Sequence, residues 1–226
     1  MKKLIYILIF PFLFSSCSLM DDYTRGKQYA GFYEEKPVVM LIMPPINNTP
    51  NVEAKEALHT TITTPLVEAG YYVVSPNLSL DFLRSESAYD AELFIDGNLE
   101  LFGSVFGADA AVFTIIDRWA KGGFGISTKI RYVIKSTKTN KVLFDRSCEL
   151  YLDLRQESEG ESSFLTALID VATTVVNTAM TDQIVAARKC NYFILEDLPR
   201  VKYSPDYLQD AGRYVSEKDI VKVIRK

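Results

Sequence analysis

The chain has 226 residues, of which 48% are hydrophobic and 24% charged, so it can bury a sizeable core and lacks the composition of a disordered chain. Its formal net charge at pH 7 is -4, and this becomes -6 once Lys2 and Lys3 leave with a signal segment. No basic stripe remains to attract phosphate groups, which excludes nucleic acid as an expected partner.

The amino terminus resembles a bacterial lipoprotein signal. Two lysines precede an apolar run of eleven residues, Leu4 to Phe14, which is too short to cross a bilayer as a helix. The run ends in the sequence LFSSC, which is similar to a lipobox, although Phe14 stands where Leu is usual and Ser16 where Gly or Ala is commoner. This resemblance implies cleavage before Cys17, with acyl chains on its thiol and on its new amino group.

Two other interpretations of Cys17 stay open, an ordinary signal in which the cysteine is incidental and an uncleaved amino-terminal anchor. Ser18 rather than Asp follows Cys17, so the retention signal of the inner membrane is absent. We therefore predict a protein lipid-anchored in the outer membrane that faces the periplasm or, given Asp21 and Asp22, the cell surface. Residues 1–16 are assigned to a signal peptide and residues 17–36 to a lipidated tether.

Residues 37–199 are predicted to form a single α/β domain. The segments 38–43 and 110–119 are apolar on both faces, which is typical of strands in a covered sheet. The alternation of strands and helices between them predicts a parallel β-α-β-α-β core with right-handed crossovers. The predicted elements are strands at 38–43, 71–75 and 110–119 and helices at 52–69, with a kink at Pro65, at 77–85 and at 99–106.

An antiparallel hairpin is predicted to extend this core into a mixed sheet. Apolar and polar residues alternate strictly along 126–135 and 142–152, on either side of a turn at 137–140, so one face should be packed and the other wet. A long helix at 164–187 is expected to cover the packed face. The remainder, residues 200–226, contains Pro205 and Gly212 and is predicted to be an irregular carboxy-terminal tail.

Two cysteines remain if Cys17 is lipidated. Cys148 and Cys190 would then lie in an oxidising compartment, where they can form a disulfide. Cys148 also falls on the packed face of the hairpin, so buried free thiols are the other interpretation.

No residue pattern indicates catalysis. The sequence has no Gly-x-Ser-x-Gly motif and a single histidine, His59, which lies three residues after Glu56. That spacing can serve a metal, but we expect a solvated helix face, and we expect neither a metal nor another cofactor. Asn47, Asn48 and Thr49 follow a parallel strand, the usual ligand position of α/β folds, and are the candidate loop for a ligand or partner.

Three motifs resemble a lipoprotein family of the meningococcal surface-antigen type, for which no function is assigned. They are PPINNT at 44–49, PLVEAGYYV at 65–73 and FGADAA at 106–111, and the likeness extends over about residues 37–199. Asn140 stands where the family tends to have Gly, and the tail diverges. The resemblance implies a lipid-anchored α/β domain similar to the amino-terminal domain of TolB and to the curli-secretion lipoprotein.

These observations together predict a non-enzymatic interaction module in an outer-membrane secretion or assembly system. Its expected partners are the membrane, through the acyl chains on Cys17, and other envelope lipoproteins or secretion-complex proteins, with a homo-oligomer left open. The alternative function is that of a periplasmic lipoprotein that binds a small ligand.

Overall fold

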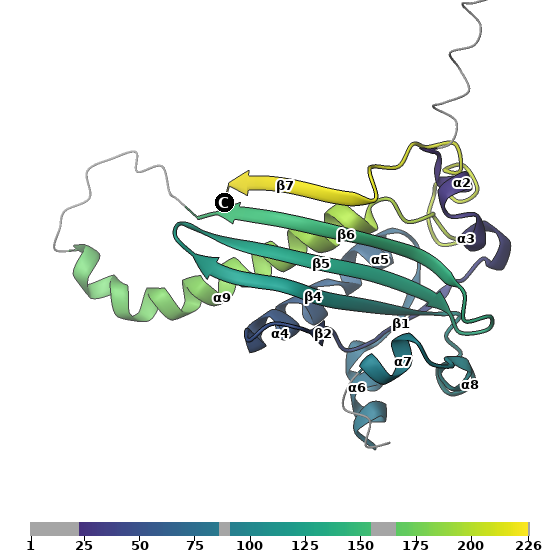
Figure 1. Cartoon of the computed structure of the whole chain (residues 1–226), viewed down its shortest axis with the longest axis horizontal. Coiled ribbons are helices and arrows are strands. Elements are labelled where there is room, and N and C mark those ends of the chain that lie inside the picture. Colours follow the sequence, from purple (N-terminus) through teal and green to yellow (C-terminus); the bar gives the residue numbers. More distant parts are fainter. Residues whose placement is uncertain (1–22, 86–90, 155–165, 226) are drawn as a thin grey trace, which may run out of the picture.

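Seven strands form one mixed sheet in the computed structural model, which describes residues 23–85, 91–154 and 166–225 (Figure 1). The strand order is β3-β1-β4-β5-β6-β7, and the short β2 pairs with β4 beside this path. The strands are β1 (Val39–Ile42), β2 (Ile46–Asn47), β3 (Tyr72–Val74), β4 (Ala110–Gly122), β5 (Gly125–Ser136), β6 (Val142–Asp153) and β7 (Asp219–Arg225).

Helices cover the two faces of this sheet unequally. One buried cluster joins the sheet to α4, α5 and the carboxy-terminal half of α9, and a second, smaller cluster on the other face joins it to α6 and α8. Figure 1 shows α9 running along the back of the long strands β4, β5 and β6. The helices are α2 (Arg25–Gln28), α3 (Ala30–Glu35), α4 (Val52–Thr61), α5 (Thr63–Glu68), α6 (Pro76–Ser85), α7 (Glu92–Ile95), α8 (Glu100–Phe106) and α9 (Thr166–Leu195).

The predicted fold class is confirmed. β1 pairs parallel with β3 and β4, and β4, β5 and β6 pair antiparallel. The helix predicted at 52–69 is divided into α4 and α5, and α4 ends at Thr61, four residues before Pro65. Proline lacks the N–H that would bond to that carbonyl and its ring clashes with it, so the division falls where the chemistry requires it.

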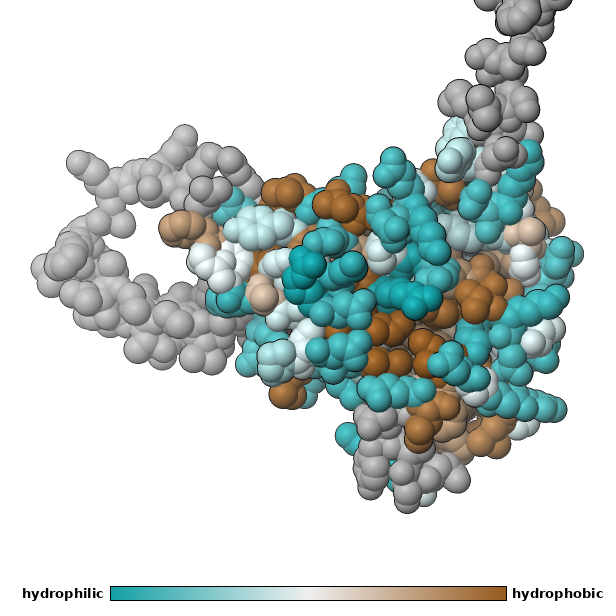
Figure 2. Space-filling model, in the orientation of Figure 1, coloured by the Kyte–Doolittle hydropathy of each residue, from teal (hydrophilic) through white to brown (hydrophobic). Residues whose placement is uncertain are grey.

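The alternation along most of the hairpin sorts its side chains as expected, but beside the turn Val142, predicted to be packed, is 56% exposed, and Lys135, predicted to be wet, is buried at an irregularity of the strand pairing. Ile130 and Cys148 are completely buried on the face that packs against α9. The other face carries charged pairs, among them Arg131, whose Nε and Nη2 donate to Asp145 at 2.8 and 2.9 Å. In Figure 2 this face is largely hydrophilic. The face that α9 covers is therefore core, whereas the opposite face of the long strands is divided: it meets water around the charged pairs and is buried where Phe113 and Val133 belong to the second cluster.

The tail was predicted to be irregular, and this prediction is wrong for residues 219–225. They form β7, which pairs parallel with β6 from Ser147 and Asp219 to Asp153 and Arg225. Without β7, the last edge of the sheet would be the twelve-residue β6 with its backbone groups unpaired. Pro205 and Gly212 earlier in the tail favoured the prediction of an irregular segment, although the short strand that follows is rich in β-branched residues.

The segment assigned to a tether is also folded where the structure describes it. From Arg25 to Glu35 it forms α2 and α3, and Tyr29 and Phe32 are buried in the main core. The Tyr29 ring lies 5.1 Å from that of Phe144. Aromatic side chains that pack in the core belong to the folded domain rather than to a flexible tether, so the folded body begins well before residue 37.

Polar groups in the core join three elements. The Tyr132 hydroxyl on β5 donates to Oδ1 of Asn191 on α9 at 2.8 Å, and Asn191 Nδ2 donates to Oγ1 of Thr61 on α4 at 2.9 Å. Asn191 and Tyr132 are completely buried. Because a buried polar group without a partner is expensive, this arrangement fixes how α4 and α9 sit on the sheet.

Cys148 and Cys190 face each other across the interface between β6 and α9 as buried free thiols. The Cys190 Sγ lies 3.3 Å from the Thr128 hydroxyl. Burial, with Cys148 beside it, raises the pKa of the Cys190 thiol well above its ordinary value. Since the thiolate is the reactive form, these thiols should be inert in the folded protein.

We expect the Cys17→Ser protein to show almost no reaction with Ellman's reagent when folded and to release two thiols per chain in denaturant, without reductant. Burial and the raised pKa both suppress the thiolate until the fold opens. Absence of thiols in the denatured, unreduced protein would contradict the expectation and indicate a disulfide.

Candidate functional site

In the loop predicted to hold a ligand, the side chains of Asn47 and Asn48 are already engaged in hydrogen bonds to the protein. Asn47 Oδ1 accepts from the backbone N–H and the hydroxyl of Thr49, at 3.1 and 2.8 Å, while Asn47 Nδ2 donates to the Asn51 carbonyl at 2.8 Å. Asn48 Nδ2 donates to Asp117 at 3.1 Å. The loop side chains therefore support a turn that leads into α4, and a ligand would have to displace these bonds.

The structure concentrates its buried charges at another place, which we call the amino-terminal corner. Here residues 23–29 pack against the segment 196–218, which connects α9 to β7 (Figure 1). Arg25 Nη1 lies 3.3 Å from Asp210 Oδ2, and both side chains are at least 95% buried. Arg25 also donates to the Glu196 carbonyl at 2.7 Å.

Backbone bonds complete this contact. The N–H groups of Arg25 and Gly26 donate to the carbonyls of Arg213 and Ala211, each at 2.9 Å, and the Val215 N–H donates to the Tyr23 carbonyl at 2.8 Å. A Cβ on Gly26 would lie 3.2 Å from the Ala211 oxygen, so glycine permits the close approach. The first described residues are thus bound to the connection that leads into β7.

A second buried ion pair holds the connection to the sheet. Arg146 on β6 is 2% exposed and pairs with the Asp197 carboxylate, while its Nη2 donates to the Ser216 hydroxyl at 2.8 Å and to the Glu217 carbonyl. The backbone N–H of Ser216 donates to Asp197 at 3.0 Å. Burial alone would raise the pKa of Asp197, but the hydrogen bonds from Ser216 and Arg146 outweigh burial and hold that pKa below its ordinary value.

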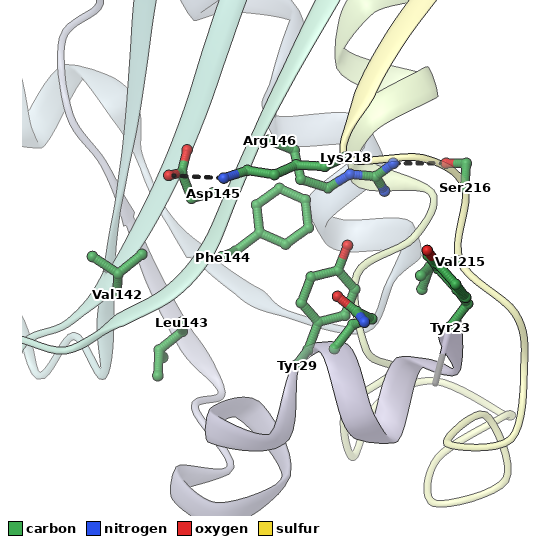
Figure 3. Close-up of a pocket in the computed structure, with 11 residues that line it drawn as sticks. Tyr23, Tyr29, Val142, Leu143, Phe144, Asp145, Arg146, Val215, Ser216 and Lys218 are labelled. Atoms are coloured by element: carbon green, nitrogen blue, oxygen red, sulfur yellow. Dashed lines mark hydrogen bonds and ion pairs between the residues drawn. The ribbon is translucent and has the colours of Figure 1, made fainter. Parts of the chain in front are cut away.

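A cavity of about 310 Å³ opens between these parts (Figure 3). In Figure 3 the Tyr29 ring rises from the amino-terminal helices toward Phe144 and Arg146, and Ser216 closes the opposite side. Burial raises the pKa of the Tyr29 hydroxyl, with Arg146 beside it acting in the other direction. The hydroxyl is therefore neutral at pH 7, and the cavity, which Asp145, Arg146 and Lys218 also line, lies between the amino-terminal helices and the carboxy-terminal connection.

The remaining predicted site residues have different outcomes. Cys17 lies outside the described residues. His59, predicted on a solvated helix face, is only 8% exposed, because α4 turns it toward the body. Among the described residues, no group of three or more His, Cys, Asp or Glu side chains could hold a metal ion.

Sequence reasoning missed the corner, although one signal was visible. Arg146 occupies a packed-face position of β6, between Phe144 and Cys148, and an arginine in that phase requires a buried acidic partner. Its partner Asp197 stands 51 residues away, where no periodicity marks it. Neither Arg25 nor Asp210 occupies a packed-face position of a predicted strand, so the sequence pattern did not indicate that pair.

We expect Asp197→Asn to lower the free energy of unfolding by about 3 kcal/mol or more, because it leaves the buried Arg146 without a counter-charge. The Asp197 pKa is depressed in the folded state, so its contribution is complete above its unfolded-state pKa and is lost as the pH falls through the folded-state pKa. The difference between native and variant should therefore shrink below about pH 4. Urea denaturation of the Cys17→Ser protein measures this.

The matched control is Glu149→Gln, on the same strand as Arg146, which breaks an ion pair with the half-exposed Arg118 on β4. An exposed pair contributes less than about 1 kcal/mol. Equal losses for the two variants would contradict the importance assigned to the buried pair, as would unchanged hydrogen exchange of β7 in Asp197→Asn.

The chain is similar to lipoproteins of Neisseria meningitidis over most of its length. The family described as "Putative lipoprotein GNA1162-like" matches residues 27–197. One relative, "Putative lipoprotein NMB1124/NMB1162" of Neisseria meningitidis serogroup B, is 25% identical over 190 residues, which are 81% of this chain and 85% of the relative.

Solved structures resemble it as well. The crystal structure of lipoprotein GNA1162 from Neisseria meningitidis is 22% identical, with a TM-score of 0.46, over 63% of this chain and 97% of that one. The PelC dodecamer from Paraburkholderia phytofirmans is 10% identical, with a TM-score of 0.38, over 72% of this chain and 88% of that one. The family match, which spans well over half of the sequence, confirms the resemblance seen in its motifs: this chain belongs to the GNA1162-like lipoprotein family.

Proposed function

We propose that this lipoprotein is held in the outer membrane by acyl chains on Cys17 and acts there without catalysis, as an interaction module of a secretion or assembly system. The observation that carries the proposal is the outer edge of β7. The proposed partner is a protein strand, supplied by another envelope lipoprotein, by a secretion-complex protein or by a second copy of this chain.

Membership of a lipoprotein family and the lipobox-like sequence support the anchor. Two or more acyl chains hold a protein on a bilayer almost permanently, since each buried methylene contributes about 0.8 kcal/mol. In the described segments, no helix is long and apolar enough to provide a membrane span instead.

The folded corner limits how far the body can stand from the membrane. Tyr23 is six residues after Cys17, and a fully extended chain covers at most about 3.6 Å per residue, or about 22 Å here. A tether through residue 36 would have reached about three times as far. The anchor therefore holds the amino-terminal corner close to the bilayer, and β7 starts from that corner.

The edge of β7 is well suited to receive a strand. β7 is the last strand in the sheet order, so no described strand pairs with its outer side. Val221 and Val223 are 71% and 73% exposed and lie on the same face, and Figure 2 shows hydrophobic surface along this edge. Strand edges with exposed apolar residues are usually protected in soluble proteins, and pairing with a partner strand is a common reason to leave one open.

The alternative function, small-ligand binding at Asn47, Asn48 and Thr49, has weaker support. The amide groups of Asn47 and Asn48 are engaged by the loop itself and by Asp117. A free sheet edge favours the interaction module, because it offers a row of backbone donors and acceptors to which a partner strand can bind.

We expect Cys17→Ser to move the protein from the membrane fraction to the soluble periplasmic fraction and to abolish labelling with a radioactive fatty acid. Only the thiol of the cysteine can carry the thioether-linked lipid. Ser18→Ala is the control, which should remain membrane-bound and labelled. Unchanged fractionation of Cys17→Ser would refute the proposed anchor.

We expect a photo-crosslinking amino acid at Val221 to give a discrete protein adduct in cells, and Val223→Lys in the same chain to remove it. A charge on the exposed face of β7 opposes strand docking while leaving the fold intact, because Val223 is mostly exposed. The control position is Val67 on α5, which is 52% exposed. Equal adducts at positions 67 and 221, or an adduct that survives Val223→Lys, would contradict docking at the edge.

A further inference from the structure

A second cavity, distant in sequence from β7, lies at the carboxyl end of β1. It has a volume of about 270 Å³ and is lined in part by Pro44 and Pro45 after the strand, by Lys55 and His59 on α4, and by Leu83 and Arg84 on α6.

This position is a topological switch point of the sheet. β1 lies between its parallel neighbours β3 and β4, and the helices that follow β1 and β3 cover opposite faces: α4 contributes to the larger core cluster and α6 to the smaller one. Where two consecutive crossover helices lie on opposite faces of a sheet, a crevice forms beyond the strand ends, and open α/β sheets bind ligands in such crevices.

The His59 side chain in this cavity lies near the Pro76 carbonyl but makes no hydrogen bond of acceptable geometry to it. It is 92% buried, and neither Nδ1 nor Nε2 has a hydrogen-bond partner within the described residues. Burial lowers the pKa of His59, the nearby Pro76 carbonyl opposes this and Lys55 adds to it, so the ring is neutral at pH 7. A buried imidazole without partners bears the full desolvation penalty, and fold stability alone would favour leucine at this position.

The lining defines which ligand would satisfy this ring. Lys55 and Arg84 bring positive charge to the cavity. Arg84 also pairs with Asp81 at 3.6 Å, but both side chains are more than 60% exposed, so that pair is weak and can be exchanged. Glu56, the acidic residue of the lining, is exposed at the rim of α4. The prolines, Leu80 and Leu83 make the rest of the wall apolar.

We propose that this cavity binds a small organic carboxylate. His59 donates a hydrogen bond to the carboxylate, Lys55 and Arg84 balance its charge, and the apolar part of the ligand lies against the proline and leucine side chains. The volume is below that of sites for drug-sized molecules, which restricts the ligand to a small one. The carboxylate favours the protonated imidazole, so affinity should rise as the pH falls toward the His59 pKa.

The test uses sodium benzoate and the full-length Cys17→Ser protein, with NMR detection of the imidazole. His59 is the only histidine of the chain, so its ring signals need no assignment. We expect benzoate to shift these signals saturably and to raise the His59 pKa. Benzamide, which has the same shape without the charge, should do neither.

Variants separate binding from a structural role. Lys55→Gln should weaken benzoate binding about tenfold, as expected for loss of a charge-assisted bond, while Lys121→Gln, on the exposed end of β4, should not change it. His59→Leu should remain folded, with a melting temperature no lower than that of the parent, and should lose benzoate binding.

The proposal is overturned if benzoate leaves the ring signals unchanged, if benzamide acts equally, or if His59→Leu binds benzoate as the parent does. Each of these results would leave the proposed function intact, because β7 and Cys17 do not contribute to this cavity.

Discussion

The buried pair of Arg146 and Asp197 is the interaction on which the rest of the arrangement depends. It fixes the end of α9 to the middle of β6, and through Ser216 and Glu217 it directs the chain into β7. A buried ion pair is weak evidence for stability, because desolvation offsets much of the attraction. Its contribution here is to specificity. A connection that took another path would leave Arg146 buried without a counter-charge, at a large cost in free energy.

The same connection receives the amino terminus. Arg25 and Asp210 form a second buried pair, and backbone bonds tie residues 23–26 to 211–215. The first described residues and the connection into β7 therefore meet at one corner, from which β7 runs along an open edge of the sheet. The link from this corner to the proposed anchor at Cys17 is short, and the open edge of β7 starts at the same corner. The proposed anchor would therefore hold this strand edge near the membrane.

The sheet separates three surfaces with different physical character. The face under α9 is core and contains the neutral Asn191 network and the two thiols. The solvent-exposed part of the opposite face carries ion pairs, which contribute little to the free energy of unfolding but keep that part of the face hydrated. The strand ends at β1 hold the cavity with His59, whose buried ring nitrogens make no hydrogen bond within the described residues.

The fold class was predictable because it follows from local patterns. The patterns are apolar runs at 38–43 and 110–119, period-two alternation at 126–135 and 142–152 and a proline four residues after Thr61. They act through backbone geometry and burial, and the structure follows them except beside the hairpin turn, where Val142 is exposed and Lys135 is buried. Even Asn140, which stands where the family has Gly, has the left-handed φ of 57° that both residues tolerate.

The charged corner, β7 and the burial of His59 were decided only by tertiary structure. Arg25 meets Asp210 across 185 residues and Arg146 meets Asp197 across 51, and charge pairing leaves no periodic mark in a sequence. A seven-residue segment becomes a strand only because β6 offers it an edge. The sequence alone determined what kind of sheet this chain builds, since that depends on neighbours along the chain; which charges are buried and which edge stays open depend on neighbours in space.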